Sequence, residues 1–138
     1  MEAVKSTVER LIGHTHVEIT TLLIPGKNDG DQEIREMSRW LATLNPNMAL
    51  HLSRYHPAYN MSLPPTGEDT IKRACEIARE YLEFVYTDNL SDENNNTYCP
   101  NCHNLLIWRN AYEIRIIGIK DRLCSRCRSQ LEFLAGLL

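Results

Sequence analysis

Two cysteine pairs constrain the fold of this 138-residue chain more than any other feature of its sequence. Cys99 and Cys102 form one C-x-x-C pair, and Cys124 and Cys127 form a second pair after an interval spanning residues 103–123. Each pair can supply two thiolates from one turn, and two such turns complete a tetrahedral site. The spacing predicts a metal site of four thiolates, with zinc favoured and iron also accepted by this ligand set.

Two disulfides are the alternative interpretation of the same four cysteines. The first residues, MEAVKSTVER, lack the apolar stretch of a signal peptide, so we expect a cytoplasmic protein, in which disulfides are rare. His103 and Arg128 follow the second cysteine of each pair, where glycine is usual because positive φ brings backbone N–H groups to sulfur. We therefore expect His103 to shape the turn, with a role as alternative ligand the second option.

The residues around the cysteine pairs predict a small separate module. Residues 105–108 and 112–117 form a predicted hairpin between the pairs, as in a zinc-ribbon or rubredoxin-like layout. The polar stretch SDENNNT predicts a linker, so we expect two domains, residues 1–92 and 93–138. Cys75 lies on an apolar helical stripe and is predicted to be a core residue. No local pattern indicates a catalytic residue.

The first domain is predicted to alternate helices with strands. Helical spacing of apolar residues indicates helices near 4–12, 34–44 and 71–82, and strands are predicted at 16–24, 49–53 and 84–87. Short connections in this order predict an α/β fold with parallel strands. The apolar run HVEITTLLI predicts a strand covered on both faces. Residues 28–31 offer turn and N-cap oxygens before the second helix, and Thr66 with Asp69 resembles a capping box for the third.

The charge distribution argues against nucleic acid as a partner. The whole chain has a net charge of −3. Residues 1–92 hold 9 Lys/Arg and 14 Asp/Glu, giving −5, while residues 93–138 hold 6 and 4, giving +2. Four thiolates around one divalent ion would bring the second value to about zero. No run approaches the roughly 20 apolar residues of a membrane helix, so no membrane partner is expected.

Three stretches carry a resemblance to a known family: HVEITTLLIPGKND, HLSRYHPAY and NTYCPNC. They resemble the C-terminal part of radical S-adenosylmethionine enzymes of the pyruvate formate-lyase-activating-enzyme-like group, which includes the radical enzyme of the AmmeMemoRadiSam system. The resemblance extends from about residue 3 to about residue 128. It implies a partial (β/α) barrel, of which this chain supplies about three parallel strands with helices, followed by a zinc-ribbon-like module.

The resemblance also implies a role for His56. Ligands of such barrels bind at the carboxyl ends of strands, and His56 matches a family position near S-adenosylmethionine and its associated cation. Arg54 and Tyr55 would flank that site. The alternative is a loop histidine held by a backbone carbonyl. No constellation is predicted around the other histidines, which we expect to be structural or exposed: His14, His16 and His51.

One departure from the family limits the expected activity. The C-x-x-x-C-x-x-C loop that binds a 4Fe–4S cluster and the glycine-rich segment that holds S-adenosylmethionine are absent from these 138 residues. We therefore expect the C-terminal portion of such an oxidoreductase, inactive alone, which gains the cluster and S-adenosylmethionine only from a separate N-terminal half. The alternative is a metal-ribbon module for protein interaction, on a half-barrel scaffold without enzymatic activity.

A half-barrel also predicts partners. Three helices can cover only the outer face of its sheet, so the inner face, with His51 and Ser53, would stay open to water or to another chain. Open sheet edges invite pairing. We expect a separate N-terminal half or a homo-oligomer, bound through an edge strand or through the apolar tail LEFLAGLL.

Overall fold

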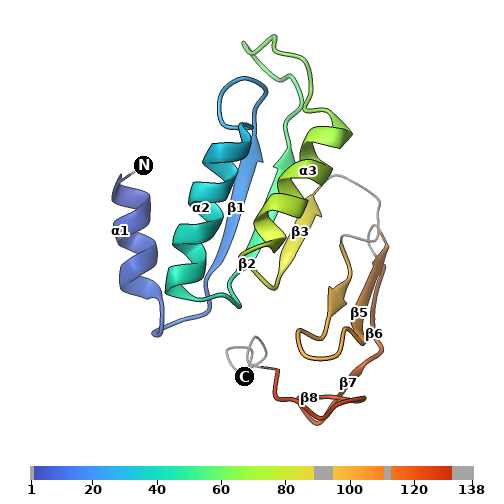
Figure 1. Cartoon of the computed structure of the whole chain (residues 1–138). Helices are drawn as coiled ribbons and strands as arrows, with labels where there is room; N and C mark the ends of the chain where they lie inside the picture. The colour runs from blue at the N-terminus through green and yellow to red at the C-terminus, as the bar shows by residue number, and fades with distance from the viewer. Residues whose placement is uncertain (1, 89–94, 111–112, 132–138) are drawn as a thin grey trace. The chain divides into compact units, whose positions relative to one another are not determined.

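The computed structural model describes residues 2–88, 95–110 and 113–131 (Figure 1). The chain divides into two compact units, Met1–Leu90 and Ser91–Leu138, and each is described by itself. Parts of the sequence expectations lie outside the described residues, namely most of the predicted linker, Tyr112 of the predicted hairpin, and residues 132–138 of the apolar tail.

The first unit is a mixed α/β structure with a parallel sheet of order β1-β2-β3. This confirms the predicted alternation of helices and strands. α2 is its longest helix, with 14 residues. Nowhere in the described part of the chain does a helix have the length and apolar character needed to cross a membrane. The elements are α1 (Glu2–Leu11), β1 (Glu18–Leu23), α2 (Asp31–Leu44), β2 (Ala49–Arg54), α3 (Glu68–Arg79) and β3 (Val85–Asp88).

Helices α2 and α3 lie on the same face of the sheet, as Figure 1 shows. Their apolar stripes follow the helical spacing of the sequence and pack against the inward residues of the strands. Cys75 is 1% exposed, which confirms its prediction as a core residue. Fully buried side chains of this core include Leu23, Ile34, Leu41, Leu50, Leu52 and Ile71.

The opposite face of the sheet carries neither α2 nor α3. The register aligns Thr20 with His51 and His51 with Tyr86, so these side chains share this face. Along β1 the residues alternate between exposed and inward positions, and Leu22 is 45% exposed. The prediction that this strand is covered on both faces is therefore wrong, because the helices of this unit cover one face only.

The predicted helix caps are replaced by glycines. Gly30 and Gly67 are the N-cap residues of α2 and α3, and neither helix has a side-chain cap. Asn28 and Asp29 instead stabilise the preceding turn, where their side-chain oxygens accept backbone N–H groups at 2.7 and 2.8 Å. The prediction of turn oxygens in residues 28–31 is therefore confirmed for Asn28 and Asp29, while the side-chain N-cap predictions for these residues and for Thr66 are wrong.

Thr66 instead connects the loop that precedes α3 to the carboxyl ends of β1 and β2 through hydrogen bonds. Its buried hydroxyl donates to the carbonyl of Leu23, at the end of β1, at 2.5 Å. The same oxygen accepts the N–H of Tyr55, just after β2, at 3.2 Å, and the Thr66 N–H donates to the Tyr55 carbonyl at 3.1 Å. One side chain therefore satisfies two buried backbone groups from neighbouring strands.

The second unit is built from short antiparallel strands. Pairing of β5 with β6 begins at Asn110 and Glu113, which confirms a hairpin between the cysteine pairs. A tight turn with positive φ at Asp121 and Arg122 joins β7 to β8, as two-residue hairpin turns require. The strands are β4 (Thr97–Tyr98), β5 (Leu105–Asn110), β6 (Glu113–Ile116), β7 (Ile119–Lys120) and β8 (Leu123–Cys124).

We expect Thr66→Val to lower the free energy of unfolding by about 1–3 kcal/mol, because it leaves two buried backbone groups without partners. Chemical denaturation of the whole chain measures this change. Thr20→Val is the matched control, since Thr20 is exposed on β1 and the substitution suits a strand. Equal effects of the two substitutions would contradict the role assigned to Thr66.

Candidate metal centre

The two cysteine pairs form turns with the same backbone hydrogen bonds. In the first turn, the Cys99 N–H donates to the Asn104 carbonyl at 2.9 Å, and the His103 N–H donates to the Cys99 carbonyl at 2.8 Å. In the second turn, the Cys124 N–H donates to Ser129 at 3.0 Å, and the Arg128 N–H donates to Cys124 at 2.9 Å. Each turn therefore holds its two sulfur atoms in one fixed geometry.

His103 and Arg128 occupy the left-handed backbone region in these turns. Their φ angles are 53° and 62°, which confirms that they stand where glycine is usual. The group of close ligand atoms consists of the four cysteines and does not include His103. His103 therefore shapes the turn in this structure.

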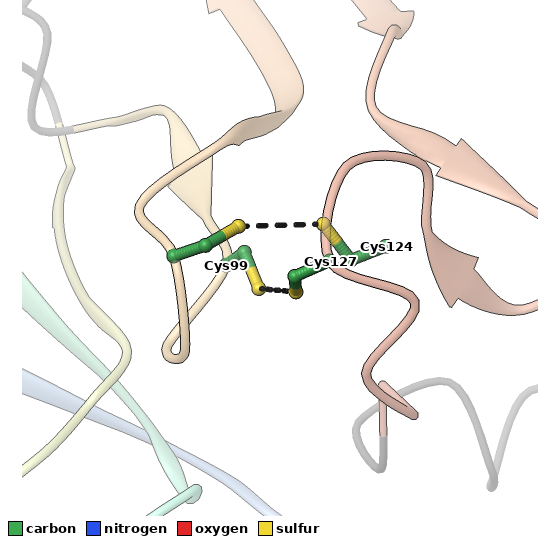
Figure 2. A group of neighbouring side chains, drawn as sticks. Cys99, Cys124 and Cys127 are labelled. Carbon is green, nitrogen blue, oxygen red and sulfur yellow. Dashed lines mark hydrogen bonds between the residues drawn. The ribbon is translucent and has the colours of Figure 1, made fainter.

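The four sulfur atoms lie at distances suited to a metal ion. Cys99 Sγ is 3.6 Å from Cys127 Sγ, as a dashed line in Figure 2 marks, and Cys102 Sγ is 3.7 Å from Cys124 Sγ. All four lie within 4.8 Å of one another. A zinc tetrahedron with bonds of about 2.3 Å has sulfur–sulfur edges of about 3.8 Å. The cysteines are free thiols, so the structure does not contain the alternative disulfides.

Hydrogen bonds favour ionisation of one of these thiols. The Ser129 hydroxyl lies 3.1 Å from Cys127 Sγ. This hydroxyl, the Ser129 backbone and the Asn101 side chain lower the pKa of Cys127 to about 5. Such hydrogen bonds to a ligating sulfur also stabilise a metal–thiolate site.

Crowding opposes ionisation of Cys102. The Asn104 backbone lowers the pKa of Cys102, but burial and the three neighbouring sulfurs outweigh it and raise the pKa to about 12. Four thiolates therefore repel one another unless a cation lies between them. The described residues contain one group of three or more ligand atoms at this spacing, and its chemistry fits a divalent ion such as zinc.

Gly118 permits the close packing of strands beside this centre. Its N–H donates to Leu106 at 3.0 Å, and its carbonyl accepts the Ser125 N–H at 2.8 Å, so it connects β5 with the second cysteine turn. A Cβ atom at this position would lie 2.1 Å from the Leu105 carbonyl oxygen. Glycine is required here because the backbone leaves no room for a side chain.

The residues at the end of β2 differ from their predicted arrangement. His56 is exposed in the loop that follows β2. Tyr55 is only 4% exposed, so the prediction that it flanks an open site is wrong. Arg54 is half-buried, donates to the Thr66 carbonyl at 2.6 Å, and approaches Glu68 at 3.5 Å. Arg54 therefore supports the loop.

A polar cluster surrounds His51 on the helix-free face of the parallel sheet. Its Nε2 is 3.2 Å from a Glu18 oxygen, and its Nδ1 is 3.5 Å from an Asp88 oxygen. Ser53 donates to Asp88 at 2.7 Å, and His16 Nε2 lies 2.9 Å from Glu18. The expectation that no constellation surrounds His16 and His51 is therefore wrong. His14 is exposed, as was expected of an isolated histidine.

The cluster joins residues from all three strands, which explains why sequence spacing missed it. Glu18, His51 and Asp88 come together only through the parallel register, in which β1 and β3 flank β2. The Tyr86 ring adds an aromatic contact, with its centroid 5.2 Å from that of His51. The hydrogen bond from His16 and the charges of His51 and His16 lower the pKa of Glu18, although burial opposes them. The open face therefore carries a linked set of titratable groups.

Sequence similarity to one relative extends over parts of both units of this chain. The chain is 34% identical over 122 residues to an uncharacterized protein of Methanocaldococcus jannaschii, MJ0808. The similarity covers 84% of this chain and 37% of the relative, so the chain spans little more than a third of that protein's length. Since 84% of 138 residues is about 116, more than the 90 of the first unit, the similarity includes part of the second unit. No family profile and no solved structure matches the chain.

We expect the purified chain to contain about one equivalent of zinc or iron, because four sulfurs at these distances complete one tetrahedral site. Cys99→Ser should remove most of this metal, as measured by elemental analysis of the purified proteins. Cys75→Ala is the control, since this cysteine lies in the core of the other unit. Metal-free protein with two intact disulfides would refute the metal site.

We expect His16→Ala to raise the pKa of the Glu18 carboxyl, because it removes the largest of the interactions that lower this pKa. A carboxyl with a lowered pKa stabilises the fold above its unfolded pKa, and this stability is lost as pH falls through the folded pKa. In the variant, this loss should be smaller and should be complete at higher pH. NMR titration of the Glu18 carboxyl carbon measures the shift. His14→Ala is the control, and an equal shift there would contradict a specific contact.

Proposed function

We propose that this chain is the C-terminal part of a radical S-adenosylmethionine enzyme of the pyruvate formate-lyase-activating-enzyme-like group. Its three parallel strands would form one sector of a partial (β/α) barrel, and its cysteine unit would be a structural zinc-ribbon-like module. The observation that carries this proposal is the two-faced sheet, with α2 and α3 on one face and the His51 cluster on the other.

The two-faced sheet is what a sector of a barrel is expected to present. Helices of a (β/α) barrel cover the outside, and alternate strand residues point to the interior. An interior made only for packing would carry branched apolar side chains. Here Glu18, His51 and Asp88 occupy those positions, and such polar, titratable groups suit the wall of a site that binds a polar ligand.

His56 occupies the position from which a barrel residue could reach a ligand. It follows the carboxyl end of β2, and ligands of parallel α/β sheets bind at that end of the strands. Its exposure leaves the imidazole accessible. Under this proposal, His56 contacts S-adenosylmethionine, while Thr66 holds the adjoining loop against β1 and β2.

The chemistry of this enzyme class requires a second part. The proposed 4Fe–4S cluster and the remaining wall of the S-adenosylmethionine site would come from an N-terminal half, which would pair with an edge strand of this sheet. The archaeal relative is long enough to include such a half, since this chain covers 37% of it. Free thiols in the cysteine unit also suit a reducing compartment such as the cytoplasm.

We expect the full-length archaeal relative, after anaerobic reconstitution with iron and sulfide, to form a 4Fe–4S cluster and to produce 5′-deoxyadenosine from S-adenosylmethionine. This chain alone should do neither, because its cysteines lack the C-x-x-x-C-x-x-C spacing. Absorption spectroscopy detects the cluster, and chromatography detects the product. A relative without a cluster, or sustained product from this chain alone, would contradict the proposal.

A second candidate function is a protein-interaction module in which the metal ribbon contacts a partner. The observation that favours it is the exposure of three isoleucines on the second unit, at 64% for Ile114, 70% for Ile116 and 57% for Ile117. Exposed apolar patches often mark interaction surfaces. Under this alternative, the reconstituted relative would bind metal at the four cysteines but would produce no 5′-deoxyadenosine.

A further inference from the structure

Strand β6 forms an edge of the antiparallel sheet in the second unit. The sheet order is β4-β5-β6, so one side of β6 faces β5 and the other has no strand among the described residues. All four residues of β6 are exposed. Its register with β5 runs without interruption from Glu113 to Ile116, and the strand contains no proline. It therefore lacks two features that commonly protect an edge from pairing.

The backbone of β6 presents hydrogen-bonding groups to that open side. The Ile117 N–H donates to the Leu106 carbonyl at 2.9 Å, which fixes the alternation of inward and outward groups in this hairpin. Because residues of an antiparallel strand alternate in direction, Arg115 bonds toward β5. Ile114 and Ile116 therefore direct their N–H and C=O groups to the open edge.

The side chains of β6 also alternate in character. Glu113 and Arg115 share one face, where Arg115 Nε donates to a Glu113 oxygen at 2.7 Å and the guanidinium lies 5.4 Å from the Trp108 ring centroid. Ile114 and Ile116 occupy the other face. The strand thus combines an apolar row with an acidic and a basic residue two positions apart.

We propose that β6 pairs antiparallel with β6 of a second copy of this chain, with Ile114 at the two-fold axis. This register places Glu113 of each copy opposite Arg115 of the other, which gives two complementary pairs. It also places the outward N–H and C=O of Ile114 opposite the same groups of the second copy. A register centred on Arg115 would instead oppose two like charges.

The charge pattern is the reason for choosing a second copy as the occupant. The order Glu113, Ile114, Arg115 is complementary to itself when reversed, so an identical strand is a matched partner. Such a two-strand contact is small, and we expect a weak dimer with a Kd of about 10 µM to 1 mM. The inference is independent of the proposed enzyme class, because it uses only the second unit.

Sedimentation equilibrium of the full, metal-loaded chain over this concentration range tests the proposal. Glu113→Arg should raise the dimer Kd at least about tenfold, because it opposes two arginines at both symmetric positions. The double variant Glu113→Arg/Arg115→Glu should restore the original Kd, since it exchanges the charges within each pair. Metal content of each variant reports whether the second unit remains folded.

Val4→Arg is the control, because Val4 lies in the first unit and is as exposed as Ile114, at 64%. This added charge should leave the dimer Kd unchanged. A monomer at all concentrations would overturn the proposal. A dimer unaffected by Glu113→Arg would place the contact elsewhere and would also overturn it. Loss of the dimer without rescue in the double variant would exclude the register on which the proposal depends.

Discussion

Four thiol groups held within 4.8 Å of one another form the constraint on which the second unit depends. Among the described residues of this unit, the buried hydrophobic core consists of Cys99, Leu106, Cys124 and Leu131, so half of that core consists of candidate metal ligands. A core this small supplies little hydrophobic stabilisation by itself. The free energy of metal binding would then provide much of the folding energy, as in other small metal-binding domains.

The two faces of the sheet in the first unit differ in character: helices cover one face, and the other is uncovered by them. Its apolar core lies between the strands and α2 and α3, where burial stabilises the fold. The other face is occupied by charged and polar groups that lie close to one another, with His51 between Glu18 and Asp88. The unit can therefore keep this face open without exposing a large apolar surface.

Local patterns in the sequence predicted much of this structure. The cysteine spacing predicted the group of four sulfurs, and the residues after each pair predicted positive φ at His103 and Arg128, because each pair forms its own turn with the residue that follows it. The alternation of helical and extended segments predicted the parallel sheet, because short connections in that order favour parallel pairing. Each of these inferences required only residues that are close in the sequence.

Features that depend on distant residues were not predictable in this way. The His51 cluster requires three strands in register, and no spacing within a single segment indicates that register. Thr66 satisfied the local pattern of a helix cap, but its hydroxyl bonds to Leu23, 43 residues away. Leu22 extended an apolar run, yet the side of the sheet it occupies depends on where the helices pack.

The unequal exposure of the four sulfurs would affect the exchange of an ion bound between them. Each turn contributes one buried sulfur, Cys99 or Cys124, and one partly exposed sulfur, Cys102 or Cys127. A chelator or an electrophile in solution therefore meets one sulfur from each turn first. While these two are displaced, the two buried sulfurs still hold the ion between the turns. An ion bound here would thus leave in steps, with the two partly exposed sulfurs released before the two buried ones.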